Sequence, residues 1–131
     1  MAKVNWKEIL GWSDEHLNEL RFSGFSFLRE GLYNKALLFF EALKILSPGN
    51  PYDLQTLGAI YLQIGENQKA LDALNAALEL VPAHEPSLLN KAKALFCLGK
   101  HAEGLSLVVT LQKSGDAAIS SDASALVLSY Q

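Results

Sequence analysis

The sequence contains only one cysteine, Cys97, and no long apolar run. A single cysteine excludes an internal disulfide, which favours a reducing compartment. No segment approaches the roughly eighteen consecutive apolar residues that a membrane-spanning helix needs. Residues 1–12, MAKVNWKEILGW, lack the apolar core of a signal peptide. We therefore expect a soluble cytoplasmic protein without membrane insertion, in which Cys97 is a buried hydrophobe rather than a nucleophile.

Clusters of basic, metal-ligating or catalytic residues are also lacking. The eleven Lys and Arg residues are scattered and the formal net charge is -3, so the sequence has no electrostatic footprint for nucleic acid. His16, His84 and His101 lack the spacing of metal ligands. No Gly-rich phosphate loop or nucleophile motif occurs. These absences predict a protein with no metal, no cofactor, no bound nucleic acid and no enzymatic activity.

Half of the residues are hydrophobic, and they follow a helical pattern that is clearest from Pro51 to His84. Apolar and small residues recur there at three- and four-residue spacing in two segments. The segments are separated by Gly65, which can adopt the left-handed conformation that ends a helix, and they are closed by Pro82. This stretch predicts a helical hairpin in which Gly58 lets the two helices approach closely.

The hairpin pattern recurs with a period of thirty-four residues, which indicates a repeat protein. Upstream and downstream positions keep the size class of their counterparts, except that Gly104 replaces an expected alanine. We expect one all-α domain spanning residues 1–131. Its predicted segments are an N-terminal helix (3–12), repeat 1 (17–50), repeat 2 (51–84), repeat 3 (85–114) and a C-terminal helix (116–131).

Capping residues and apolar positions refine the two ends. Ser13 and Asn50 are predicted helix caps, and Pro51 suits a first helical position. The last helix is expected to start at Ser121 or Asp122, and its apolar residues pack on repeat 3 or on another surface. The first helix either staples itself to repeat 1 or contacts a co-chaperone or a second copy. Its candidate contact residues are Trp6, Ile9, Leu10 and Trp12.

The Gly-Tyr pair, the Ala-aromatic-Ala set and the closing proline resemble the tetratricopeptide repeat over residues 17–114. The resemblance implies a superhelix whose first helices line a concave surface. The departures at Ser23, Lys91 and Gly104 predict weaker packing, most of all in repeat 3.

The resemblance also implies which residues line this groove. Members that grip the C-terminal carboxylate of heat-shock chaperones use Lys, Arg and Asn, whereas Phe25, Ala59 and Leu89 occupy those places here, which argues against that function. About half of the apolar positions are expected to be core. The groove residues predicted for partner binding are Arg21, Phe22, Phe25, Leu28, Arg29, Tyr52, Thr56, Ala59, Leu62, Gln63, Leu89, Lys93 and Phe96. Asn18, Gln55, Pro86, Asn90 and Cys97 occupy the remaining groove positions.

The phrases FLREGLYNKALLFFEALKILSPGNP and YLQIGENQKALDAL resemble the tetratricopeptide chaperones of bacterial type III secretion. The short chain favours the branch that holds the needle subunit, usually with a second small helical protein. This resemblance implies a cytoplasmic bacterial chaperone that binds an amphipathic or apolar helix and prevents premature polymerisation. The alternatives are a translocator chaperone and a general scaffold for complex assembly.

Overall fold

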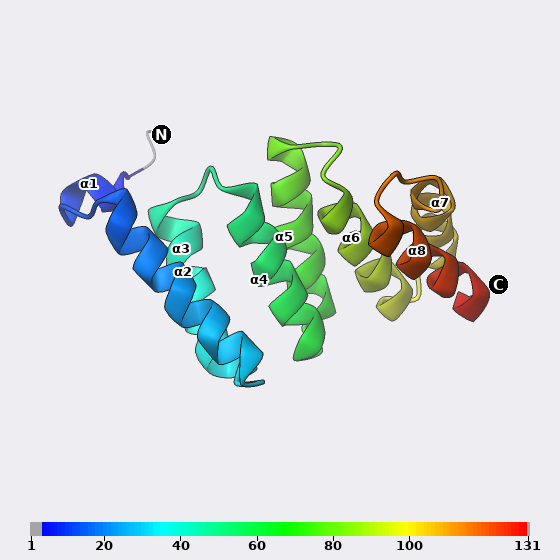
Figure 1. The fold of residues 1–131 in the computed structure, drawn as a ribbon, viewed down its shortest axis with the longest axis horizontal. Coiled ribbons are helices and arrows are strands. Elements are labelled where there is room, and N and C mark those ends of the chain that lie inside the picture. Colours follow the sequence, from blue (N-terminus) through cyan, green and yellow to red (C-terminus); the bar gives the residue numbers. More distant parts are fainter. Residues whose placement is uncertain (1–3, 131) are drawn as a thin grey trace.

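The computed structural model describes residues 4–130, and the regular structure in this range is entirely α-helical. Consecutive helices form three hairpins, α2 with α3, α4 with α5 and α6 with α7, and α8 packs on the last of them. Figure 1 shows these elements following one another along the long axis, from α1 at one end to α7 and α8 at the other. The helices are α1 (Trp6–Ile9), α2 (Asp14–Arg29), α3 (Tyr33–Leu46), α4 (Pro51–Gln63), α5 (Asn67–Leu80), α6 (Glu85–Cys97), α7 (His101–Leu111) and α8 (Ala117–Tyr130).

Each hairpin turns at a glycine with left-handed backbone geometry. Gly65 has a φ of 83°, and Gly31 and Gly99 occupy the same place in the other two hairpins with φ of 75° and 79°. Since residues with a Cβ rarely adopt this conformation, the glycines set where each first helix ends. The predicted all-α arrangement of three helical hairpins with a helix added at either end is confirmed.

Small residues let the two helices of a hairpin touch. A Cβ added to Gly58 would lie 2.6 Å from Cγ of Leu74, and one added to Gly24 would lie 2.6 Å from Cε2 of Phe40. Leu74 and Phe40 are completely buried. The close approach inferred from the sequence at Gly58 therefore holds, and the same contact recurs in the first hairpin.

In repeat 3 the glycine that allows close contact between the two helices lies on the second helix of the hairpin instead of the first. Gly104 lies on α7, and a Cβ there would stand 2.7 Å from the ring of Phe96 on α6. Phe96 is itself buried. The expectation that Gly104 weakens the packing is therefore wrong. The Phe96 ring occupies the space that the methyl group of an alanine would need, so the glycine leaves no gap.

Two predicted helix caps are present. The Ser13 hydroxyl accepts a hydrogen bond from the backbone N–H of His16 at the start of α2. The Asn50 side chain accepts bonds from the N–H groups of Tyr52 and Asp53 at 2.9 and 3.1 Å, and Pro51 takes the first helical position. These contacts satisfy backbone donors that the helix itself leaves unpaired.

The first helix is shorter than its predicted segment 3–12, and the last helix starts earlier than the expected Ser121 or Asp122. α1 spans only Trp6–Ile9 and is followed by Gly11 at a φ of 66°, while Lys3, the predicted start, lies outside the described residues. α8 begins at Ala117, next to the start of the predicted segment 116–131 and before the expected helix start at Ser121 or Asp122. The Asp116 carboxylate caps it, since it accepts hydrogen bonds from the N–H groups of Ala118 at 2.9 Å and Ile119 at 3.2 Å. The predicted end at Gln131 also lies outside the described residues.

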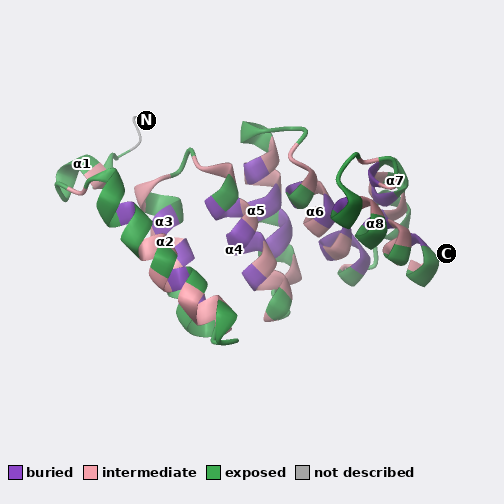
Figure 2. Ribbon diagram, in the orientation of Figure 1, coloured by how far each residue is buried: buried purple, intermediate pink, exposed green. Residues whose placement is uncertain are grey.

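Buried residues occur on helices all along the stack from α2 to α8 (Figure 2), and they form separate core clusters. The cluster of repeat 1 and α4 is built around Phe40, Leu43 and Leu57. A second cluster joins α6 and α7 to α8. In α8, Val127 is buried and Leu126 and Tyr130 pack against this cluster, as expected, whereas Leu128 is 77% exposed.

Candidate partner-binding groove

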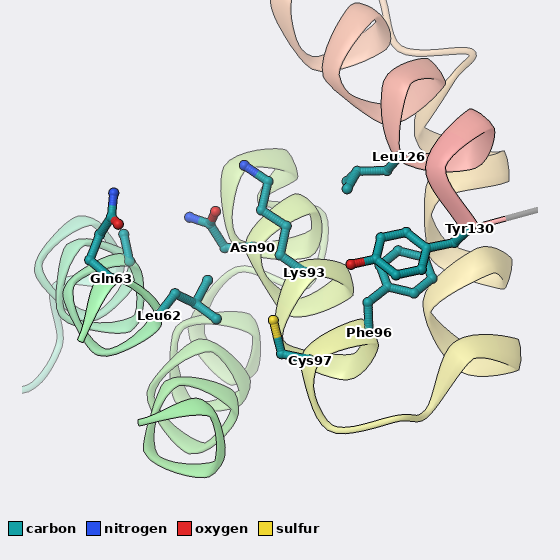
Figure 3. A pocket seen from close by; sticks show the side chains of 9 residues that line it. Leu62, Gln63, Asn90, Lys93, Phe96, Cys97, Leu126 and Tyr130 are labelled. Carbon is teal, nitrogen blue, oxygen red and sulfur yellow. The ribbon is translucent and has the colours of Figure 1, made fainter. Parts of the chain in front are cut away.

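A cavity of about 480 Å³ lies between α4, α6 and α8. Figure 3 shows Leu62 and Gln63 on α4, Asn90 and Lys93 on α6, and Leu126 and Tyr130 on α8 around this space. Its size is in the range of ligand pockets in proteins. We call this space the groove pocket; its lining residues are Ala59, Leu62, Gln63, Asn90, Lys93, Phe96, Cys97, Leu126 and Tyr130.

Helical periodicity explains why these residues meet. On α6, Asn90, Lys93 and Cys97 follow one another at three- and four-residue spacing, which places them on one face. The lining residues of α4 and of α8 follow the same rule. Three separate helical faces therefore converge on one cavity.

The pocket has apolar walls and one charged group. Lys93 is the only charged residue of the lining, and the other polar groups are the amides of Gln63 and Asn90, the Tyr130 hydroxyl and the Cys97 thiol. The ion pairs found within residues 4–130 join Lys7 to Asp14 and Arg21 to Asp53, so neither involves Lys93. The pocket is therefore positively charged although the chain as a whole is negative.

Two stacked aromatic rings form one side of the pocket. Phe96 is only 3% exposed, and the Tyr130 ring lies parallel to it with 4.1 Å between centroids and 1° between planes. The imidazole of His101 meets both rings edge on, at 6.0 and 5.4 Å between centroids. The stack fixes the end of α8 against α6.

α8 occupies part of the groove that the sequence assigns to a partner. Leu89 is 5% exposed and lies in a core cluster with Ile119 and Val127 of α8, so it does not line the pocket. Because α8 packs over Leu89, the open surface of α6 is the one that carries Asn90, Lys93 and Cys97.

α4 contributes three of its five predicted positions. Ala59, Leu62 and Gln63 line the pocket. Thr56 is 9% exposed and its hydroxyl donates to the carbonyl of Tyr52 at 2.9 Å, so it is committed to its own helix. Tyr52 is exposed outside the pocket and meets the His84 ring edge on at 5.3 Å between centroids.

Arg21 is held inside the protein by Asp53. Its Nε donates to both carboxylate oxygens at 2.8 and 3.0 Å, and Nη2 donates to Oδ2 at 2.7 Å. Asp53 is 3% exposed, and these hydrogen bonds raise the pKa of the Arg21 guanidinium above its ordinary value. The predicted groove cation therefore forms a partly buried bridge between repeats 1 and 2. The sequence signal that could have shown this is the acidic Asp53 in the first turn of α4.

The other predicted residues of α2 lie outside the pocket. Phe22 is 70% exposed, and Phe25 is partly exposed with its ring edge against Phe40 at 5.1 Å between centroids. Leu28 packs against the first core cluster, and Arg29 is exposed and donates to the Ser26 hydroxyl.

The N-terminal residues form a separate apolar surface. Trp6, Ile9 and Leu10 are exposed, and Trp6 lines a second cavity of about 410 Å³ with Ile45 of α3. Trp12 packs against the core of repeat 1. Of the four predicted contact residues, Trp12 thus anchors the N-terminal segment to repeat 1, and the other three remain exposed for contact with a partner.

The sequence did not reveal the part of the pocket that α8 contributes. Leu126 and Tyr130 were predicted to pack, and they also form its third wall. Cys97 is exposed and lines the pocket, which agrees with the groove position that the resemblance implied, whereas the prediction that it is a buried hydrophobe is wrong. Figure 3 shows its sulfur directed into the space between Leu62 and Phe96.

No helix among the described residues is long and apolar enough to cross a membrane. Nor do residues 4–130 bring three metal-ligating side chains together as a candidate metal site.

Comparison with solved structures identifies the type of superhelix. The Yersinia enterocolitica type III secretion translocator chaperone SycD superposes with a TM-score of 0.85 at 19% identity, covering 98% of this chain and 99% of SycD. PcrH, solved in complex with the chaperone-binding region of PopD, gives a TM-score of 0.78 at 20% identity over 92% of this chain and 94% of its own. At these identities the likeness shows the fold alone.

Sequence comparison adds a relative and a family. The mitochondrial import receptor subunit TOM70 of Saccharomyces cerevisiae is 30% identical over 104 residues, or 79% of this chain. The chain spans only 16% of the length of that relative. The profile of the family described as anaphase-promoting complex, cyclosome, subunit 3 matches residues 29–111, which is more than half of the chain. The protein therefore belongs to this family and has the tetratricopeptide-repeat fold.

Proposed function

We propose that the protein is a non-enzymatic chaperone that holds an amphipathic or apolar helix of a partner in its concave groove. The observation that carries the proposal is the groove pocket, whose apolar walls come from three helices and remain open within a folded chain. An exposed apolar concavity in a folded protein typically marks an interaction site. Burial of apolar surface would drive the binding.

The partner class that we propose is a secreted helical subunit of a bacterial type III secretion system, held in the cytoplasm until export. The support is the likeness to SycD and to PcrH, which was solved with the chaperone-binding region of PopD. Holding the helix would prevent premature polymerisation of a needle subunit.

A translocator subunit is the second candidate partner. Chain length does not separate the two, because the superposition covers 98% of this chain and 99% of the translocator chaperone SycD. The third candidate function is a scaffold that links stable proteins. Its support is the 30% identity to TOM70, a mitochondrial import receptor subunit and not a secretion chaperone.

Co-expression with each class of subunit tests the proposal. We expect a needle-type or translocator-type subunit to become soluble only when the chaperone is present. Leu62→Glu places a carboxylate in the groove pocket and should abolish this effect without changing the circular dichroism of the chaperone. A matched control is Leu38→Glu, since Leu38 is 66% exposed on α3 and does not line the pocket.

Two results would contradict the proposal. If Leu62→Glu still solubilises the subunit, the pocket is not the binding site. If every subunit is soluble alone and merely associates with this protein, the scaffold function is favoured instead.

A further inference from the structure

We propose that Lys93 makes the groove pocket selective for a partner helix with a carboxylate side chain one turn from a large apolar side chain. The inference rests on the proposed function and deepens it by naming the chemistry of the bound segment. It starts from the single positive charge of the pocket.

Lys93 faces a cavity that offers no acidic partner. The lining contains no Asp or Glu, and neither ion pair within residues 4–130 involves this lysine. Its side chain is half-buried before any partner arrives. A partner that covers it removes more water from the ammonium group, and burying a charge without a counter-charge is costly. A purely apolar or basic segment would therefore be disfavoured.

The groups around Lys93 suit a carboxylate. Asn90 lies three residues earlier on the same face of α6, and Gln63 stands on α4 across the cavity. Their amide N–H groups can donate to a carboxylate oxygen while the ammonium group supplies the charge. Three donors thus line the same, largely apolar cavity.

The apolar half of the pocket receives the neighbouring side chain. Leu62 and Leu126 face it from α4 and α8, and the Phe96–Tyr130 stack forms its side. On a helix, side chains three or four residues apart lie about 5–6 Å from each other between Cβ atoms. A partner helix can therefore present its anchor and its carboxylate to the two halves of the pocket together.

The geometry favours a side-chain carboxylate over the carboxyl terminus of a chain. The tetratricopeptide members that grip a terminal carboxylate use Lys, Arg and Asn side chains at several groove positions together. Here Arg21 already donates to the buried Asp53, while Phe25 and Leu89 carry no polar group and Leu89 is buried. Within the lining of the groove pocket, Lys93 is therefore the only cation that can pair with an anion.

A displayed library of random 16-residue peptides tests the inference. It would be selected separately against the wild-type chain, Lys93→Glu, Lys91→Glu and Leu62→Glu. Lys91 is the matched control, because it is a half-buried lysine on the same helix that lines a different hollow with Leu95 and Leu107. We expect the wild type and Lys91→Glu to enrich Asp or Glu three or four residues from an aliphatic or aromatic residue, and Lys93→Glu to enrich Lys or Arg there.

Calorimetry on synthetic, C-terminally amidated versions of the selected peptides then measures the effect. Replacing the acidic residue by Lys should weaken binding to the wild type about tenfold, and binding to Lys93→Glu should strengthen correspondingly. If the wild type and Lys93→Glu select the same sequences, the inference is wrong while the groove proposal stands. If amidation alone abolishes binding, the recognised group is a chain terminus and the inference is also wrong. If Leu62→Glu selects the same peptides as the wild type, the groove proposal itself fails.

Discussion

The ring of Tyr130 lies parallel to the ring of Phe96, with centroids 4.1 Å apart and 1° between the ring planes. Tyr130 is the last residue of α8, and Phe96 lies near the end of α6. The contact joins the added C-terminal helix to the wall of the groove pocket. The same two side chains therefore bear on stability and on binding.

Tyr130→Ala should lower the free energy of unfolding by about 1–2 kcal/mol, because it removes an aromatic pair and its buried area. Urea denaturation followed by circular dichroism measures this loss. Leu128→Ala on the same helix is the control and should change stability by less than about 0.5 kcal/mol, since Leu128 is 77% exposed. Equal losses in the two variants would mean that the stack does not hold α8.

Gly104→Ala should destabilise the protein by about 1–3 kcal/mol, although alanine is the better helix former. The new Cβ would stand 2.7 Å from the Phe96 ring. Thermal unfolding of the single variants and of the Gly104→Ala, Phe96→Leu double variant measures the coupling. We expect the alanine to cost less in the double variant, because the smaller leucine side chain leaves room for the new methyl group. A stabilising Gly104→Ala would show that the ring and the glycine do not compete for space.

Arg21→Met should destabilise the fold by about 2–4 kcal/mol, because it leaves the Asp53 carboxylate buried without its cation. The bridge spans repeats 1 and 2, so amide exchange in α2 and α4 should accelerate together. Arg29→Met serves as the control, since Arg29 is exposed and donates only to a serine hydroxyl. The bridge is not a structural one if both variants are equally stable.

Stability should fall in alkali between about pH 10 and pH 12 because of Tyr61. Burial, with a 2.7 Å hydrogen bond from its hydroxyl to Glu41, raises the pKa of Tyr61 to about 12. The pKa of Tyr61 in the folded protein exceeds its ordinary value of about 10. The contribution of Tyr61 to the free energy of unfolding is therefore complete below pH 10 and is lost as the pH rises through 12. Tyr61→Phe should show a smaller alkaline loss in urea denaturation. Ultraviolet titration should show that one of the four tyrosines ionises at a higher pH than the other three.

The exposed apolar surface of Trp6, Ile9 and Leu10 predicts self-association or binding of a small co-chaperone. Ile9 is 64% exposed beside exposed Trp6 and Leu10. Sedimentation analysis of the isolated protein should reveal a homodimer that Ile9→Glu converts to a monomer with unchanged circular dichroism. If the wild type is a monomer at all concentrations, the contact serves a different protein, and co-purification with a small helical partner should then depend on Ile9.

The sequence predicted those features that depend on local signals. Gly65 marks a helix end because its own backbone needs a positive φ, and Asn50 caps α4 through atoms two and three residues away. The close approach of two helices at Gly58 could be inferred because a small residue, Gly24, recurs one period of thirty-four residues earlier. Such features require no knowledge of how distant helices are oriented.

The features that were missed depend on where α8 packs. No repeat or motif sets the rotation of this helix, and its apolar residues occur on more than one face, as exposed Leu128 and buried Val127 show. The position of α8 decides that Leu89 is buried and that Tyr130 lines the pocket. The Arg21–Asp53 bridge was missed for a similar reason, because it joins residues of two different repeats.

The third wall of the groove pocket also affects how the stack responds to a ligand. In a repeat array each unit is stabilised mainly by its immediate neighbours, so one end can open without the other. α8 contacts α6 and α7, whereas α4 lies on the far side of the pocket. A segment seated between α4 and α8 would link units that are not neighbours. Occupancy should then make unfolding of the C-terminal half more cooperative, and slowed hydrogen exchange in α8 would report it.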